Sequence, residues 1–239
     1  MHEENCFLTL TYNNKHLPED GSVSKKEMQA FMKKLRRKIE PKQVKFYLCG
    51  EYGDKLERPH YHVLLFGFDF VDKELHHVSD PKKKNRFSTG SMYQVYTSKL
   101  LSEIWTKGFS SVGEVSLESA GYVARYIGKK IGGERAKGHY KGKEPEFALM
   151  SRNPGIGASW IKKYFWDVYP KDFYTIEGRK FKPPRFFDER LKRKCWPMYE
   201  EVKERRKANA RDEDIIRRRD KEKYLKEVTK TLERDYENG

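Results

Sequence analysis

The chain has 239 residues, enough for one domain of ordinary size with appendages. Its 51 Lys and Arg against 36 Asp and Glu give a net charge of +15, which favours a polyanionic partner because neutralised phosphates release condensed counterions. RNA and anionic membranes would attract the same charge. The 3 widely spaced cysteines contain no C-x-x-C pair, which argues against a disulfide scaffold or zinc finger. No apolar run approaches the roughly 18 residues of a membrane span, so we expect a soluble, cytosolic protein without membrane partners.

The first two elements have clear signals. Residues 5–12 alternate in side-chain character, which predicts a strand. Ser24 and Glu27 form a capping box, and the apolar residues after it recur at helical spacing until Pro41 ends the helix. The apolar stripe is Met28, Phe31, Met32, Leu35 and Ile39.

The outward face of that helix is strongly basic. Such a run is at least as typical of a solvated helix face as of a DNA contact. As candidate DNA-binding residues we take Lys33, Lys34, Arg36, Arg37, Arg125 and Arg152.

The elements that follow predict an α+β fold, an antiparallel sheet with flanking helices. Strands are expected at 44–49, 60–68 and 112–117, and helices at 100–105 and 119–131. The polar segment 71–92 lacks periodicity and is predicted to be a loop.

Composition divides the chain into three parts. Residues 1–133 would form the core domain, and 134–187 a basic and aromatic extension packed on that core. Residues 188–239 would form a charged helical tail, because apolar residues at helical spacing lie there within dense mixed charge.

The sharpest chemical signal is a histidine pair. His60 and His62 are two apart in a predicted strand, so both project from one face and can share a divalent ion. A lone histidine is usually a packing residue, but two at this spacing on an otherwise apolar strand favour a metal site. Glu51, in the preceding strand region, is the favoured third ligand, with Asp54 and Glu57 as competitors. Two imidazoles and one carboxylate suit Mg²⁺ or Mn²⁺, although zinc is chemically possible.

A tyrosine pair forms the second signal. Tyr122 and Tyr126 are four apart in a predicted helix and therefore share one face. Spacing alone is more typical of packing than of catalysis. Arg125 and Lys129 each follow a tyrosine by three residues, which puts a cation one turn from each hydroxyl. A phenol needs such a neighbour, or a metal-polarised phosphate, to become a useful nucleophile.

These segments resemble a known family. The stretches FLTLTY, LCGEYG, RPHYH, GYVARYIGKK and MSRNPGIG are similar to hallmark segments of HUH replication initiators of microviruses, particularly the gokushovirus branch. The resemblance covers roughly residues 5–165. Many initiators of that branch carry a cysteine-rich segment ahead of the first strand, and the present sequence departs from them there.

The resemblance implies a ferredoxin/RRM-like HUH fold with specific residue roles. His60, His62 and Glu51 would be ligands of Mg²⁺ or Mn²⁺, and Tyr122, Tyr126 and Lys129 would be catalytic. The enzyme would nick and rejoin DNA through a 5′-phosphotyrosine and so initiate rolling-circle replication of a single-stranded DNA phage genome. Its partners would be origin single-stranded DNA and the host helicase and polymerase, in the cytoplasm of the bacterial host.

Three other readings compete with this one. A conjugative relaxase uses similar chemistry, but its tyrosine typically precedes the histidine strand. A plain metal-dependent nuclease would use water and form no covalent adduct. An RRM-like nucleic-acid-binding module shares the element order and the charge, but would stack bases on sheet aromatics and would not need paired histidines.

Overall fold

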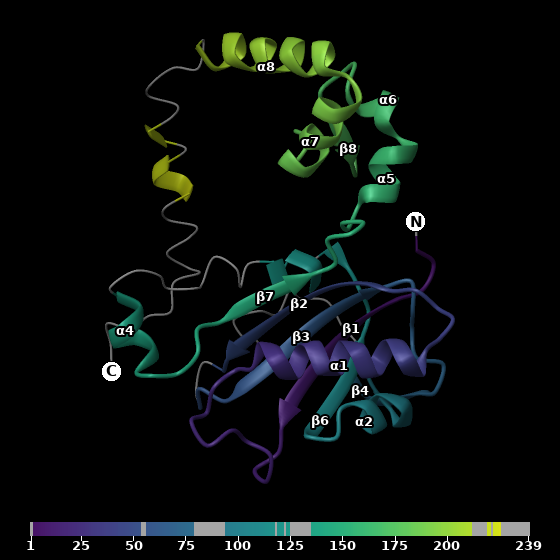
Figure 1. Ribbon diagram of the computed structural model, residues 1–239, viewed down its shortest axis with the longest axis vertical. Coiled ribbons are helices and arrows are strands. Elements are labelled where there is room, and N and C mark those ends of the chain that lie inside the picture. Colours follow the sequence, from purple (N-terminus) through teal and green to yellow (C-terminus); the bar gives the residue numbers. More distant parts are fainter. Residues whose placement is uncertain are drawn as a thin grey trace. The chain divides into compact units, whose positions relative to one another are not determined.

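The computed structural model describes residues 2–53, 56–78, 94–117, 119–121, 123–124, 135–211, 219–220 and 222–225. The chain divides into two compact units, His2–Ile156 and Gly157–Glu233, and each is described by itself. Figure 1 shows the ribbon of both units, with the sheet in the first. The predicted divisions after residues 133 and 187 stay predictions.

The first unit is built on a seven-stranded antiparallel sheet in the order β4-β5-β6-β1-β3-β2-β7. Its strands are β1 (Asn5–Tyr12), β2 (Lys45–Tyr52), β3 (Pro59–Phe66), β4 (Lys73–Val78), β5 (Gln94–Ser98), β6 (Gly108–Gly113) and β7 (Phe147–Met150). Its named helices are α1 (Lys25–Lys38), α2 (Lys99–Ile104) and α4 (Arg135–Tyr140). The predicted α+β class, an antiparallel sheet with flanking helices, is confirmed.

The middle of this sheet has the split β-α-β arrangement that the sequence predicted. The strands β6-β1-β3-β2, with α1 after β1 and α2 before β6, follow the ferredoxin-like order. The β4-β5 pair is inserted between β3 and α2, and β7 extends the other edge beside β2.

Two predicted segments differ from the structure. The region 71–92, predicted as a loop, contains β4, whose side chains are almost all exposed. An exposed edge strand needs no apolar alternation, so no periodic signal marks it in the sequence. The strand predicted at 112–117 lies at Gly108–Gly113 instead. It begins at a glycine because a Cβ on Gly108 would lie 2.2 Å from the carbonyl oxygen of Thr11.

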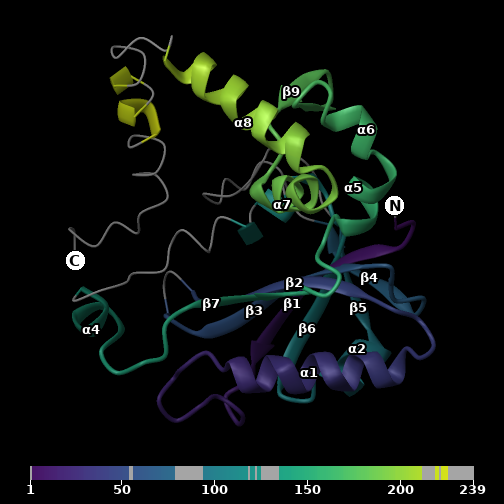
Figure 2. The same cartoon turned by 45° about the horizontal axis from the view of Figure 1, so that its top comes forward.

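The main core lies between one sheet face and the helices α1 and α2, which Figure 2 shows on the same side of the sheet. Alternate residues of β1 are buried, as the pattern predicted. Ser24 is the N-cap of α1, and its hydroxyl accepts a hydrogen bond from the Glu27 amide at 3.2 Å. That confirms the predicted helix start. The α1 residues Met28, Phe31, Met32 and Leu35 are buried against the strands.

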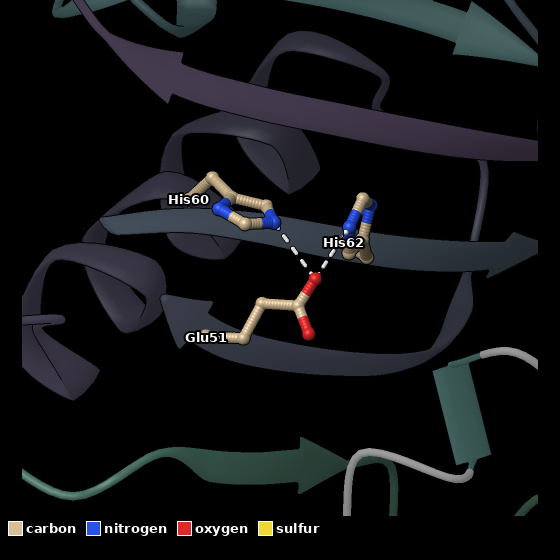
Figure 3. A group of neighbouring side chains, drawn as sticks. All are labelled: Glu51, His60 and His62. Atoms are coloured by element: carbon tan, nitrogen blue, oxygen red, sulfur yellow. Dashed lines mark hydrogen bonds and ion pairs between the residues drawn. The ribbon is translucent and has the colours of Figure 1, made fainter. Parts of the chain in front are cut away.

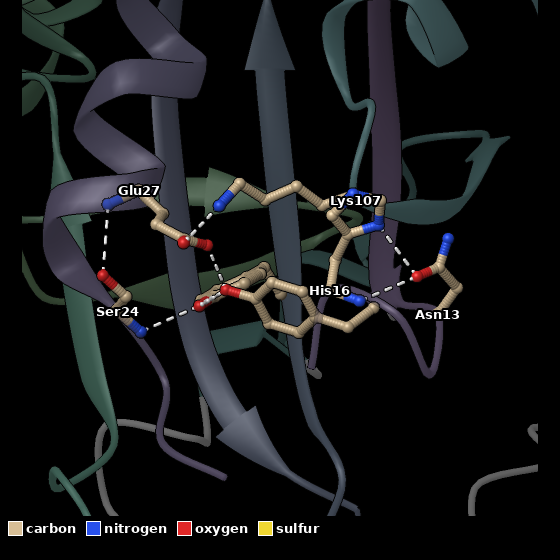
Figure 4. Close-up of polar contacts among 7 residues, drawn as sticks. Asn13, His16, Ser24, Glu27 and Lys107 are labelled. Carbon is tan, nitrogen blue, oxygen red and sulfur yellow. Dashed lines mark hydrogen bonds and ion pairs between the residues drawn. The ribbon is translucent and has the colours of Figure 1, made fainter. Parts of the chain in front are cut away.

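A polar group is buried within this core (Figure 4). The hydroxyl of Tyr61, a fully buried residue of β3, accepts from the Ser24 amide at 2.8 Å and lies 2.8 Å from the Tyr12 hydroxyl. Tyr12 in turn donates to Glu27, which also pairs with Lys107. Glu27 therefore does not complete a reciprocal capping box. Tyr61 faces the core, so it cannot serve as the base-stacking platform that an RRM-like reading would need.

The second unit has a separate small core. Its elements are α5 (Ala158–Lys163), α6 (Phe165–Val168), β8 (Tyr174–Ile176), β9 (Arg179–Phe181), α7 (Arg185–Lys194) and α8 (Trp196–Arg211). Seven buried side chains form this core: Ile161, Phe165, Val168, Tyr169, Phe187, Leu191 and Val202. Arg206 of α8 pairs with Asp172 and Asp188 and so joins α8 to the loop before β8 and to α7. None of the described helices is long and apolar enough to cross a bilayer.

We predict that Tyr61→Phe lowers the free energy of unfolding by about 1–3 kcal/mol, because it leaves the Ser24 amide and the Tyr12 hydroxyl short of a partner. Urea denaturation monitored by circular dichroism measures the change. Tyr47→Phe is the matched control, since the buried Tyr47 hydroxyl has no hydrogen-bond partner among the described residues. Equal losses in the two variants would contradict the role assigned to Tyr61.

Candidate metal centre and active site

Glu51, His60 and His62 meet on the sheet face opposite α1 (Figure 3). Glu51 of β2 is the cross-strand partner of His60 in β3, and His62 follows on the same face. One carboxylate oxygen, Glu51 Oε1, lies 2.7 Å from His60 Nε2 and 2.9 Å from His62 Nε2. The structure thus brings together the three residues that the sequence predicted, with Glu51 inside its strand rather than at the end.

The site is mostly buried, which determines its electrostatics. Glu51 is 1% exposed and His62 6%, whereas the His60 side chain is 19% exposed. Burial opposes ionisation of Glu51, but the hydrogen bonds with the two imidazoles hold the pKa of this carboxyl below its usual value. Burial also lowers the pKa of His62. An ionised carboxylate and a neutral imidazole are the protonation states that bind metal ions.

The hydrogen bonds around the imidazoles fit a metal ion. His60 Nδ1 lies 3.1 Å from the Arg58 carbonyl oxygen, and His62 Nδ1 lies 3.1 Å from the Thr9 hydroxyl. With each Nδ1–H donating to these acceptors, both Nε2 lone pairs face the Glu51 carboxylate. Two ligands bound at about 2.1 Å to one ion lie roughly 3 Å apart, close to the spacing seen here.

Glu51 itself provides a second indication of a missing cation. Its other oxygen, Oε2, is buried and has no hydrogen-bond partner among the described residues. An ionised buried oxygen without a donor is costly, and a bound cation would satisfy it. The residues present therefore fit a divalent ion, although the geometry does not select among metals.

The competing acidic ligands do not join this group. Glu57 is exposed and pairs with Lys143 at 2.8 Å, so the structure does not bring it to the histidines. Asp54 lies outside the described residues.

Part of the metal-bearing face is covered by a small apolar cluster. Residues 119–121 and 123–124 are helical, and Val123 is fully buried against Cys49 and Leu64. Cys49 and Leu64 each lie two residues from a candidate ligand, on the same face of β2 and β3. The Phe7 ring stacks on the His62 imidazole, with centroids 5.3 Å apart.

The predicted catalytic residues follow in that helical region. Tyr122, Arg125, Tyr126 and Lys129 lie outside the described residues. Their roles stay predictions, and Val123 is the nearest described residue that contacts the metal-bearing face.

The basic residues of α1 lie away from the metal centre, because α1 covers the other face of the sheet. Lys34 donates to the carbonyl oxygens of Glu103 and Ile104 and so caps the C-terminus of α2. Arg36 lies over the Phe46 ring, 5.3 Å from its centroid. Lys33, Arg37 and Arg152 are exposed. DNA binding by these residues stays a prediction.

Two partners of the site were missed by the sequence reasoning, Thr9 and Arg58. Alternation placed Thr9 on one face of β1, but only the pairing of β1 with β3 puts it beside His62. Arg58 contributes its backbone oxygen to His60, and its side chain holds the end of β1 by donating to the Tyr12 carbonyl at 2.8 Å. A backbone acceptor leaves no signal in residue type.

The fold and this cluster define a single-sheet α+β protein with a candidate divalent-metal site. The family model of the replication-associated protein ORF2 matches residues 5–131, just over half of the chain. The chain belongs to this family, and the resemblance to phage replication initiators found in the sequence is confirmed at that level.

Individual relatives agree with the family. The chain is 31% identical to the replication-associated protein ORF2 of Spiroplasma virus 4, over 99% of this chain and 77% of that protein. It is 32% identical to the replication-associated protein VP4 of Bdellovibrio phage phiMH2K, over 81% of this chain, but spans only 59% of that protein. For the replication-associated protein ORF4 of Chlamydia phage 1, the values are 29% identity, 80% and 47%. No solved structure matches the chain.

We predict that Mn²⁺ binds the wild-type protein with one site and raises its melting temperature, because an ion that binds only the folded state stabilises it. His62→Ala should weaken binding by more than the roughly 10- to 100-fold typical of a lost outer-sphere partner. Titration calorimetry measures the affinity. His76→Ala is the control, since His76 is exposed on β4. Unchanged affinity in His62→Ala would remove the metal assignment.

We also predict that Thr9→Val weakens Mn²⁺ binding by roughly 10- to 100-fold, because it removes the acceptor that orients the His62 ring. Thr9→Ser keeps a hydroxyl and should retain most of the affinity, which separates the hydrogen bond from packing. The same calorimetric titration provides the comparison. If the serine and valine variants bind equally, the hydroxyl does not orient the ligand.

Proposed function

We propose that the protein is a metal-dependent DNA endonuclease and strand transferase that initiates rolling-circle replication of a small single-stranded DNA phage genome. The observation that carries this proposal is the convergence of Glu51 Oε1 with both imidazole Nε2 atoms. Membership in a phage replication-associated family supplies the biological setting. Its nucleic-acid partner would be single-stranded DNA at the replication origin.

In this proposal the three ligands and a tyrosine divide the work. A divalent cation, Mg²⁺ or Mn²⁺, bound by Glu51, His60 and His62 would polarise the scissile phosphate and stabilise the charge developing on it. The oxygen of Tyr122 or Tyr126 attacks the phosphorus while the bond to the 3′ oxygen breaks. The products are a 5′-phosphotyrosine and a free 3′-hydroxyl, so the energy of the phosphodiester is retained and joining needs no ATP.

The second tyrosine would allow the reaction to close. After one round of synthesis it attacks the regenerated origin, and the released 3′-hydroxyl then attacks the first phosphotyrosine to form a circle. Arg125 and Lys129, one turn from the tyrosines in the sequence, would favour the ionised phenol. The packing of Val123 on Cys49 and Leu64 supports a helix that reaches this face.

The cellular setting follows from the same proposal. The free 3′-hydroxyl is a primer for the host polymerase, and a host helicase would separate the strands. Both meet the protein in the cytoplasm of the bacterial host. The net charge of +15 supports contact with the phosphate backbone.

The rival readings make different demands. A water-using nuclease needs the same metal ligands but no tyrosine. An RRM-like module needs exposed sheet aromatics and no metal. The buried Tyr61 and the Glu-His-His group favour an enzyme over that module.

We predict that the protein, incubated with labelled single-stranded origin DNA and Mn²⁺, forms a covalent complex that survives denaturing electrophoresis. Tyr122→Phe and Tyr126→Phe should each keep some nicking, because the other tyrosine is available, but should produce few closed circles. The double variant should form no complex and should still bind Mn²⁺, because loss of two phenolic oxygens leaves the ligands in place.

Three outcomes would contradict parts of this scheme. Cutting by the double variant would show a water-using nuclease. Complete loss in Tyr126→Phe with a silent Tyr122→Phe would show a single-tyrosine enzyme and exclude alternation. No cutting or covalent complex in wild type under these conditions would contradict the proposed activity as a whole.

A further inference from the structure

Phe109, in β6, is an aromatic residue in an unusual position. Its side chain is 72% exposed, although β6 is an inner strand of the sheet. The next residue but two, Val112, faces the main core and is fully buried. Since side chains alternate along a strand, Phe109 points to the other face, the one that carries the metal ligands.

The register of the sheet puts Phe109 in line with those ligands. Phe109 pairs with Thr11 of β1, Thr11 pairs with His60, and His60 pairs with Glu51. Residues directly opposite one another in antiparallel strands project from the same face. Phe109 therefore lies two strands from His60, or about 10 Å at the usual spacing of ~4.8 Å.

Cover over this face decreases towards Phe109. The row that contains Leu64 is covered by the cluster around Val123, whereas the His60 side chain is 19% exposed and Phe109 is largely open. Between the ligands and Phe109 lies Thr11, a partly exposed polar residue. The open part of the face is thus a polar strip with a metal site at one end and an aromatic ring at the other.

The backbone fixes the start of β6 where Phe109 projects. Gly108, directly before it, packs so closely on β1 that an added Cβ would lie 2.2 Å from the Thr11 carbonyl oxygen. The Asn13 amide donates to the Lys107 carbonyl at 3.0 Å on the other side. The ring is therefore carried by a rigid segment, although nothing among the described residues buries it.

We propose that Phe109 is a stacking platform for a base of single-stranded DNA, on a nucleotide next to the phosphate held at Glu51, His60 and His62. This inference rests on the proposed function and adds a residue that positions its substrate. An exposed ring accepts any base, because every base has a π-face, and phosphate contacts add affinity without sequence preference. A sugar and base attached to a phosphate at the ligands span a length comparable to the separation from Phe109.

The test measures the affinity for a fluorescein-labelled oligodeoxythymidylate by anisotropy, with metal removed by chelator so that no strand is cut. Phe109→Thr deletes the ring and keeps a β-branched residue suited to a strand. It should weaken binding roughly 5- to 150-fold, the range expected for one lost base–aromatic stack. Phe109→Tyr retains a ring and should bind within about twofold of wild type.

Two controls separate stacking from other effects. Leu75 is also exposed, 56%, but pairs with Tyr96, which is opposite Val112 and so lies on the helix-bearing face. Leu75→Thr should leave DNA affinity unchanged. An unaltered melting temperature and unaltered Mn²⁺ binding in Phe109→Thr would show that the fold and the ligands are intact. An abasic residue at the stacked nucleotide should remove the difference between wild type and Phe109→Thr.

The outcomes are distinct from those that test the proposed function. Wild-type affinity in Phe109→Thr would overturn the platform, and so would equal losses in the threonine and tyrosine variants. If the wild-type protein forms no covalent complex, yet Phe109→Thr selectively loses single-stranded DNA, the platform stands and the proposed nicking activity fails. Nicking with an unaffected Phe109→Thr variant gives the opposite result.

Discussion

The register between β1, β3 and β2 is the constraint on which the site depends. Pairing puts Thr9 opposite His62 and Glu51 opposite His60, so three neighbouring strands direct their polar side chains to one face. The side-chain period of a strand is two, and a slip of one residue would turn each of these groups to the helix-bearing face. Alternation fixes the register strongly, because β1 buries Cys6, Leu8 and Leu10 on the other side.

The two faces of the sheet therefore have different physical roles. The helix-bearing face supplies most of the apolar burial among the described residues, together with the satisfied hydroxyls of Tyr12 and Tyr61. The opposite face contains an ionised, buried carboxylate that contacts two histidines. Burial of such a charge costs stability unless it is paired, so the first face offsets what the second requires. Metal binding would return part of that cost.

Local patterns predicted much of this arrangement from the sequence. Alternation identified β1, the capping residue Ser24 identified the start of α1, and the spacing of His60 and His62 identified the ligand pair. Each of these signals lies within a few consecutive residues. Glu51 was favoured over Glu57 because it belongs to the preceding strand region, and the structure agrees with that choice.

Features that depend on pairing between distant segments had no such signal. Thr9 is 53 residues from His62, and only strand order makes them neighbours. Phe109 falls outside the strand expected at 112–117, because a glycine at its start hid the beginning of β6. The strand β4 is exposed, so no apolar pattern was needed to specify it. Sequence periodicity reports burial, and it is silent where a strand edge or an open functional face is not buried.

The ligands and the proposed nucleophiles are held in different ways. Glu51, His60 and His62 belong to strands paired on both sides, with main-chain hydrogen bonds along their length. The helical residues around Val123 contact the sheet through a cluster with three buried members among the described residues, Cys49, Leu64 and Val123. Few buried contacts allow a segment to move at low cost, whereas central strands open only with the whole domain. A joining reaction with two tyrosines needs one ion position and two nucleophile positions. Rigid strands suit the first requirement, and a lightly packed helix suits the second.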